Sequence, residues 1–155
     1  MKRSGGCQCG AVRYAVEGEL GRPSICHCRM CQKAFGSFFG PFVTAKAGQF
    51  SWTRGAPAYF QSSNKVRRGF CRDCGTPLTY EWGPAEVELS IGSFDDPTDL
   101  KPVVQLSPET AMPWLRELPD LPTRSVSEVL AAAGHYSELI SYQHPDHDTE
   151  TWPHG

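Results

Sequence analysis

The sequence predicts an all-β fold of short antiparallel strands. Seven segments of four to seven residues carry strand-forming or alternating side chains, and turn residues separate them. Thirteen prolines and fifteen glycines among 155 residues leave little room for long helices. This length suits one domain with a modest core rather than two. The predicted strands cover residues 11–16, 38–44, 49–53, 58–62, 66–70, 78–81 and 86–91.

The first and last of these segments show the strand pattern most clearly. Val12, Tyr14 and Val16 alternate with smaller or polar residues, and the run stops at residues 17–18, Glu-Gly. Residues 86–91 alternate in the same way. Because successive side chains of a strand point to opposite faces, this period of two predicts half-buried strands.

Two short helices interrupt the strand pattern. Residues 29–34 can form a single helical turn inside the central cysteine cluster. Residues 125–128, Ser-Val-Ser-Glu, offer a capping box, the following residues 129–133 favour helix, and Gly134 supplies a stop. One short C-terminal helix is therefore expected.

The remaining chain is irregular. Residues 97–122 are punctuated by proline, and we expect them to wrap over the sheet with Trp114 and Leu115 as anchors. The tail from residue 135 is rich in acidic residues and proline, which favours a solvated or partly ordered segment. It carries four of the five histidines: His135, His144, His147 and His154.

Seven cysteines fall into three tight clusters, and none stands alone. Thiols one to three residues apart can converge on one metal ion, whereas disulfides need well-separated partners, and an odd count would leave one sulfur unpaired. The last cluster reads Cys-x-x-Cys-Gly, which is typical of a zinc-binding turn. The clusters are Cys7 with Cys9, then Cys26, Cys28 and Cys31, then Cys71 with Cys74.

The seven thiols divide into four plus three. The first and last clusters can close one tetrahedral site, while the middle cluster can hold a second ion with one position open. Metal sites with four protein ligands are usually structural, whereas sites with an open coordination position can bind a substrate and catalyse its reaction. Thiolate-rich tetrahedral sites select zinc or iron–sulfur clusters, and the longer iron–sulfur spacings do not occur, so two zinc ions per chain are expected.

The middle cluster also has a second interpretation, as a structural zinc site completed by His27 or by a tail histidine. His27 lies between two ligands, and adjacent residues seldom bind one metal with good angles. We therefore expect it beside the site or at the surface. A third hypothesis treats Cys28 and Cys31 as a thiol redox sensor.

Charge is distributed unevenly along the chain. Residues 1–75 hold 12 Lys/Arg against 3 Asp/Glu, and residues 76–155 hold 3 against 14. An anionic partner of the basic half is one interpretation, and simple balance of thiolate and acidic charge is the other. The acidic half should repel phosphate, so nucleic acid is not expected as a partner.

Location follows from what the sequence lacks. No segment approaches the length of a membrane span, and the first seven residues lack the apolar run of a signal peptide. A reducing cytoplasm is the default for a protein whose cysteines remain thiolates.

Three motifs carry a family resemblance: GCQCGAVRY at residues 6–14, CHCRMCQKAFGS at residues 26–37 and RGFCRDCGTPL at residues 68–78. In the order and spacing of all seven cysteines they resemble the glutathione-dependent formaldehyde-activating enzyme family, also called the centromere protein V domain family. The resemblance spans roughly residues 4 to 122.

The resemblance implies an all-β fold of the β-tent type, with a zinc-binding β-tent domain over residues 1–122 and a C-terminal helix and polar tail over residues 123–155. In that family the first and last cysteine pairs hold a structural zinc, and the middle triplet holds the catalytic one. The implied activity condenses glutathione with formaldehyde to S-hydroxymethylglutathione, a carbon–sulfur lyase reaction. Many members carry a histidine near the position that Gln105 occupies here.

Glutathione is a net anion, so cationic side chains near the triplet are candidate anchors for its carboxylates. We expect Lys33, Arg67 and Arg68 in this role, with hydrogen bonds from Ser62. The alternative function is a non-enzymatic zinc module whose basic face binds an acidic partner.

Overall fold

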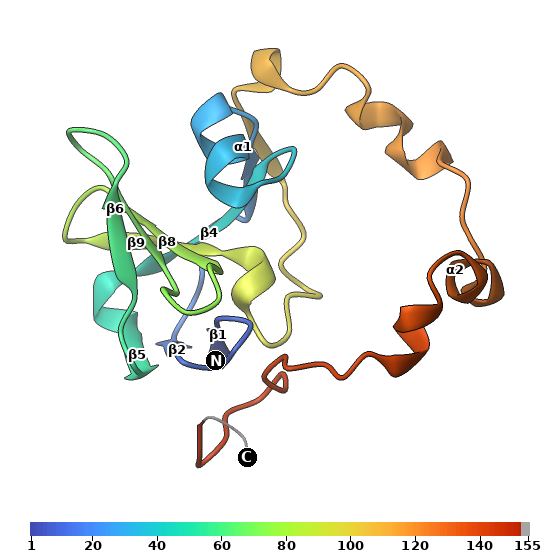
Figure 1. The fold of residues 1–155 in the computed structure, drawn as a ribbon. Coiled ribbons are helices and arrows are strands. Elements are labelled where there is room, and N and C mark those ends of the chain that lie inside the picture. The colour runs from blue at the N-terminus through green and yellow to red at the C-terminus, as the bar shows by residue number, and fades with distance from the viewer. Residues whose placement is uncertain (153–155) are drawn as a thin grey trace.

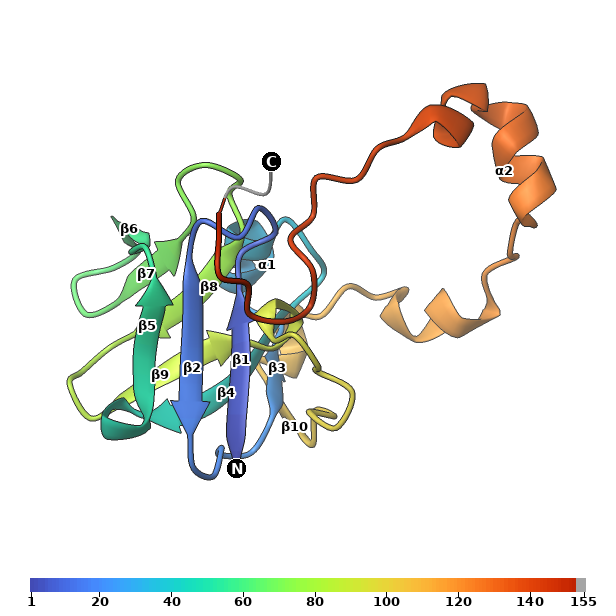
Figure 2. The same ribbon diagram turned by 90° about the horizontal axis from the view of Figure 1, so that it is seen from below.

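Two β-sheets form the body of the protein in the computed structural model, which describes residues 1–152. The smaller sheet has the antiparallel order β1-β2-β5, and Figure 2 shows it lying across the larger one. The larger sheet has the order β10-β3-β4-β9-β8-β7-β6, antiparallel except for the β10–β3 pair. The strands are β1 Lys2–Gly6, β2 Arg13–Glu17, β3 Ser24–Cys26, β4 Gly40–Lys46, β5 Phe50–Arg54, β6 Ala58–Gln61, β7 Arg67–Phe70, β8 Pro77–Glu81, β9 Glu86–Ser90 and β10 Val104–Leu106.

Helices are few and short, so the chain is mostly β-sheet. The α-helices are α1 Arg29–Phe35 and α2 Val126–Ala132. The 3-10 turns are η1 Ala47–Gln49, η2 Ile91–Ser93, η3 Pro108–Thr110, η4 Leu115–Asp120 and η5 Gly134–Glu138. Within residues 1–152, no helix has the length and apolar character needed to cross a membrane.

The core lies between the two sheets. Tyr14 and Val16 of β2 pack with Val43 of β4 and Leu89 of β9, and all four side chains are buried. The Tyr14 hydroxyl is 2.8 Å from the Ser93 hydroxyl, so its one polar group is satisfied. The period-two pattern of the sequence thus places the apolar residues of both sheets on facing surfaces.

All seven predicted strands are present, with ends shifted by up to two residues. Three further strands were not predicted: β1, β3 and β10. β1 is rich in Gly, Ser and basic residues, and β3 and β10 have three residues each, so none carries an alternating apolar pattern. The predicted C-terminal helix is confirmed as α2, which begins with a capping box between Ser125 and Glu128.

The predicted path of residues 97–122 over the sheet is wrong for its second half. β10 pairs with β3 at the sheet edge, and beyond residue 110 the chain leaves the body as an arch that includes α2 (Figures 1 and 2). Trp114 contacts Phe38 edge-on at 4.7 Å between ring centroids but remains 38% exposed. Trp114 therefore holds the start of the arch against the body, and it does not hold a segment that covers the sheet.

Candidate metal centres and substrate cavity

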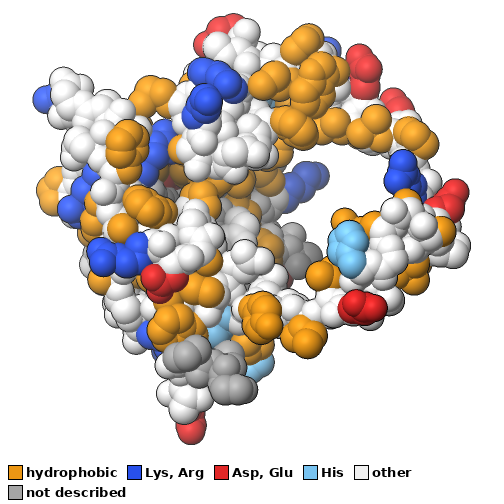
Figure 3. All heavy atoms as spheres, viewed as in Figure 1, with side chains coloured by type: hydrophobic (Ala, Val, Ile, Leu, Met, Phe, Trp, Pro, Cys, Tyr) orange, Lys and Arg blue, Asp and Glu red, His pale blue; other side chains and the backbone are white. Residues whose placement is uncertain are grey.

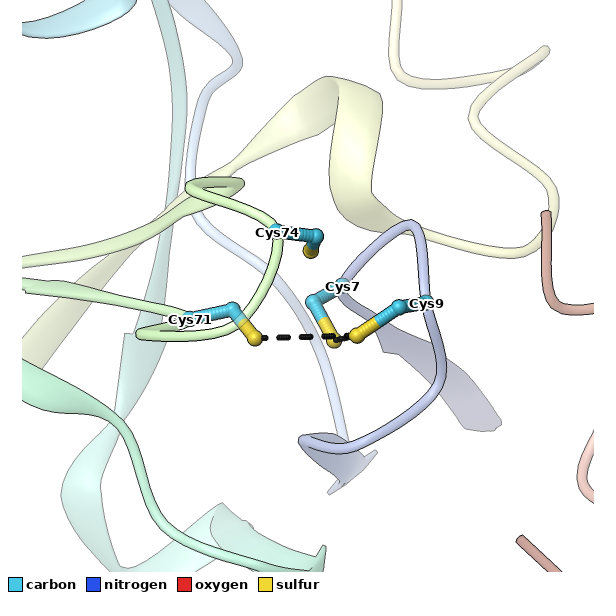
Figure 4. Close-up of side chains that lie close together, drawn as sticks. All are labelled: Cys7, Cys9, Cys71 and Cys74. Carbon is cyan, nitrogen blue, oxygen red and sulfur yellow. Dashed lines mark hydrogen bonds between the residues drawn. The ribbon is translucent and has the colours of Figure 1, made fainter. Parts of the chain in front are cut away.

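Four cysteines from two distant turns meet at one point. Cys7 and Cys9 lie in the turn after β1, and Cys71 and Cys74 lie in the turn between β7 and β8, as Figure 4 shows. The Sγ atoms of Cys7 and Cys9 are 3.6 Å apart, and those of Cys9 and Cys71 are 3.8 Å apart. All four sulfurs lie within 4.8 Å of one another, and none forms a disulfide. This set could hold a metal ion, as four converging thiols do in closed tetrahedral sites.

The surroundings of these thiols combine burial with local hydrogen bonds. Burial raises the pKa of Cys7, although the Val12 N–H donates to its sulfur at 3.3 Å. Burial also acts to raise the pKa of Cys74, but hydrogen bonds from Thr76 and Cys9 together outweigh it and lower the pKa to about 6. Gly75 adopts a φ of 79°, which lets the chain turn back after Cys74.

The C-terminal tail packs against this site. His144 is only 4% exposed, and its backbone N–H donates to the Gln8 carbonyl at 2.7 Å. The Trp152 indole donates to the carbonyl of Cys9. Asp148 forms an ion pair with the buried Arg13 at 2.7 Å. The predicted solvated tail is therefore wrong for His144, whereas most of residues 143–152 are exposed and the segment is held by a few specific contacts. His135 and His147 are exposed, and His154 lies outside the described residues.

Loosening the tail should therefore expose the four-cysteine site. In the double variant Asp148→Ala/Trp152→Ala, we expect a chelator to extract metal from this site about tenfold faster, because about 1.4 kcal/mol of contact energy would no longer oppose local opening. A chromophoric chelator measures the rate. Glu150→Ala, an exposed position between the two that makes neither of these contacts, is the matched control. Equal rates in the double variant and the control would contradict a protective tail.

The middle cluster is assembled where β3 meets α1. Cys26 ends β3, Cys28 is the N-cap of α1, and Cys31 lies in its first turn. The Cys28 sulfur accepts a hydrogen bond from the Cys31 N–H at 3.4 Å. All three sulfurs lie within 4.8 Å of one another and could hold a second metal ion.

No fourth protein ligand accompanies this triplet within residues 1–152: no histidine, aspartate or glutamate joins the three thiols. His27 is 0% exposed, and its Nε2 lies 3.1 Å from the Gln105 side-chain oxygen. His144 lies in the tail contact described above. The two histidine sources considered for a fourth ligand are thus directed elsewhere, as far as the structure describes them.

A cavity of about 450 Å³ opens over the triplet. Its walls come from β3, β4, β7, β8, β9, β10 and the start of α1, and they are mainly apolar or aromatic. The lining residues besides the three cysteines are Ser24, Met30, Phe42, Ser63, Val66, Arg68, Tyr80, Trp82, Glu88 and Leu106.

Of the described residues, Arg68 is the one lysine or arginine in this lining. It is buried, and its guanidinium donates to the Cys31 sulfur at 3.5 Å and to the Ser62 hydroxyl at 3.1 Å while lying 4.8 Å from the Tyr80 ring centroid. Burial raises the pKa of Cys31 to about 12, and the hydrogen bond from Arg68 acts against this. The cation therefore favours the thiolate form that metal binding requires.

The predicted anchors are distributed over different surfaces. Lys33 and Ser62 line an adjoining hollow that shares Arg68 with the cavity. Arg67 lies outside both, where it pairs with Glu81 at 2.7 Å and covers the Tyr59 ring at 4.1 Å.

Glu88 in the cavity wall was not among the predicted site residues. The signal was present, because the alternation of residues 86–91 directs Glu88 away from the core, on the face opposite Val87 and Leu89.

Together, the mostly β fold and the two thiol clusters define a class of cysteine-rich protein with one closed site and one site facing a cavity. The chain belongs to the family described as glutathione-dependent formaldehyde-activating enzyme, whose model matches residues 2–108. A crystal structure of a Rhodobacter sphaeroides protein, determined by structural genomics, is similar at a TM-score of 0.53 and 26% identity. That match covers 66% of this chain and 98% of the other.

Proposed function

We propose that this protein is a zinc-dependent carbon–sulfur lyase that joins a small thiol such as glutathione to formaldehyde. The main observation in support is the cysteine triplet, which faces a cavity and has no fourth protein ligand within residues 1–152. Family membership supports the same chemistry. In the reaction a carbon–sulfur bond forms between thiol and aldehyde, and the thiol proton passes to the aldehyde oxygen.

The donor sets support zinc at both sites. Cys7, Cys9, Cys71 and Cys74 would hold a structural ion, and Cys26, Cys28 and Cys31 a catalytic one. A zinc ion at the triplet would supply Lewis acidity and favour ionisation of a bound thiol. The two crossed sheets, joined at the four-cysteine site, support the β-tent type implied by the family.

The chain's own residues would prepare the cavity for this reaction. Arg68 offsets negative charge at Cys31, and the apolar walls, which include Phe42 and Val66, exclude water. Lys33 and Ser62 in the adjoining hollow are proposed to bind a substrate carboxylate. Arg67 could join them only by leaving Glu81, so it is the least supported of the proposed anchors.

The alternative, a zinc module that binds an acidic partner, receives less support. Basic side chains gather over the sheets, as Figure 3 shows. Several of these side chains already form ion pairs within the protein: Arg3 with Asp99, Arg13 with Asp95 and Asp148, and Arg67 with Glu81. Their charge is therefore only partly available to a partner.

A turnover assay tests the proposed function. Metal-replete protein, mixed with glutathione and isotope-labelled formaldehyde, should raise the rate of exchange between free aldehyde and adduct above the uncatalysed background, measured by NMR exchange spectroscopy. A rate equal to background over a range of thiols would overturn the proposal.

A further inference from the structure

The floor of the cavity is a row of side chains that crosses four strands. Arg68 of β7 pairs with Tyr80 of β8, Tyr80 with Glu88 of β9, and Glu88 with Thr44 of β4. Arg68, Tyr80 and Glu88 line the cavity. The neighbouring residue Leu89 faces the core between the sheets. One face of the large sheet therefore builds the core, and the other presents this polar row to the substrate.

Among the described residues, Glu88 is the only carboxylate in the cavity lining, and it belongs to none of their ion pairs. Its Oε1 accepts a hydrogen bond from the Thr44 hydroxyl at 2.8 Å. Within residues 1–152, no Lys, Arg or His forms an ion pair with it. Burial raises the pKa of Glu88, with a smaller contribution from Glu86. A partly desolvated carboxylate of this kind is stabilised by a ligand that brings a cation.

The charges of the cavity are separated along the row. Glu88 lies two strands from Arg68, which corresponds to roughly 10 Å at the usual strand spacing. Arg68 lies at the triplet end, against Cys31. The cavity thus complements a molecule whose anionic sulfur lies at the triplet and whose positive group lies some bonds away.

We propose that Glu88 is a specificity-determining residue that binds the ammonium group of an aminothiol substrate. This inference rests on the proposed function, because it places the substrate thiol in the same cavity. The α-ammonium of glutathione belongs to this chemical class, and a thiol without an ammonium group would leave Glu88 unpaired. A site built around a charged partner discriminates against analogues that lack it.

The test compares glutathione with N-acetylglutathione, which lacks the positive charge. In the metal-loaded wild type, acetylation should raise KM about tenfold and change kcat little. In Glu88→Gln, which can keep the hydrogen bond from Thr44, KM for glutathione should rise about tenfold and the two thiols should become equivalent. Glu86→Gln, an exposed change on the same strand, should behave as wild type. Equal KM values for the two thiols in the wild type would overturn the inference.

Binding of S-methylglutathione, which cannot react, separates this inference from the proposed function. Calorimetry should show binding to the wild type that weakens about tenfold in Glu88→Gln. Glu88-dependent binding without any turnover would sustain the inference and overturn the lyase assignment. Turnover that does not depend on Glu88 would sustain the lyase assignment and overturn the role of Glu88. If neither turnover nor Glu88-dependent binding were found, both the lyase assignment and the role of Glu88 would be overturned.

Discussion

Replacing Cys71 with serine is expected to unfold the domain. Cys71 is 0% exposed, and its cluster joins the β1–β2 turn of the small sheet to the β7–β8 turn of the large one. A structural zinc contributes on the order of 10 kcal/mol to folding in small zinc domains. Because the whole stability of a domain is about 5–15 kcal/mol, loss of one ligand should remove most of it.

Circular dichroism and thermal denaturation of metal-replete protein measure this effect. We expect Cys71→Ser to lose its cooperative transition, and a chelator in excess should have the same effect on the wild type. Arg72→Ser, an exposed change in the same turn, should leave the melting temperature nearly unchanged. A folded Cys71→Ser protein with a wild-type melting temperature would show that the four-thiol site is dispensable for the fold.

Replacing Cys28 with serine is expected to abolish turnover and leave the fold intact. Cys28 is half-buried at the cavity and caps a seven-residue helix. Unlike Cys71, it does not belong to a cluster that connects the two sheets. Serine is also a good N-cap, which preserves the start of α1. Removal of one metal ligand at a Lewis-acid site forfeits several kcal/mol of transition-state stabilisation, or about a thousandfold in kcat/KM.

The measurement pairs the exchange assay with metal analysis and a thermal melt. The variant should hold one zinc where the wild type holds two, and its melting temperature should fall by no more than a few degrees. An unfolded Cys28→Ser protein would show that the triplet is a second structural site. Full activity with the metal lost would show that the triplet takes no part in the reaction.

The cysteine partition could be predicted from sequence because ligand spacing is local. Two close thiols cannot complete a tetrahedron, so Cys7/Cys9 must find a distant pair, and three thiols at residues 26–31 are nearly sufficient alone. Strands could also be predicted wherever apolar and polar residues alternate. β3 and β10 were missed because three residues hold no period, and their pairing depends on contacts between segments about 80 residues apart.

The cavity could not be predicted from local pattern. Alternation in residues 67–68 separates Arg67 from Arg68, but only the tertiary contact between Arg68 and Cys31 of α1 decides which side faces the triplet. For Glu88, alternation predicts that the side chain points away from the core, but it does not predict that a cavity lies on that side. The composition of the tail indicated solvation, yet Asp148 and Trp152 find specific partners in Arg13 and Cys9. Such pairings are set by tertiary contacts that composition does not contain.

X-ray absorption at the zinc edge, with and without added thiol, tests the central claim most directly. Seven thiolates shared by two ions give an average of about 3.5 sulfur neighbours per zinc, and one incoming substrate thiol should raise this to about 4. An average that stays fixed when glutathione is added, with a full set of protein ligands at both ions, would contradict an open position at the triplet.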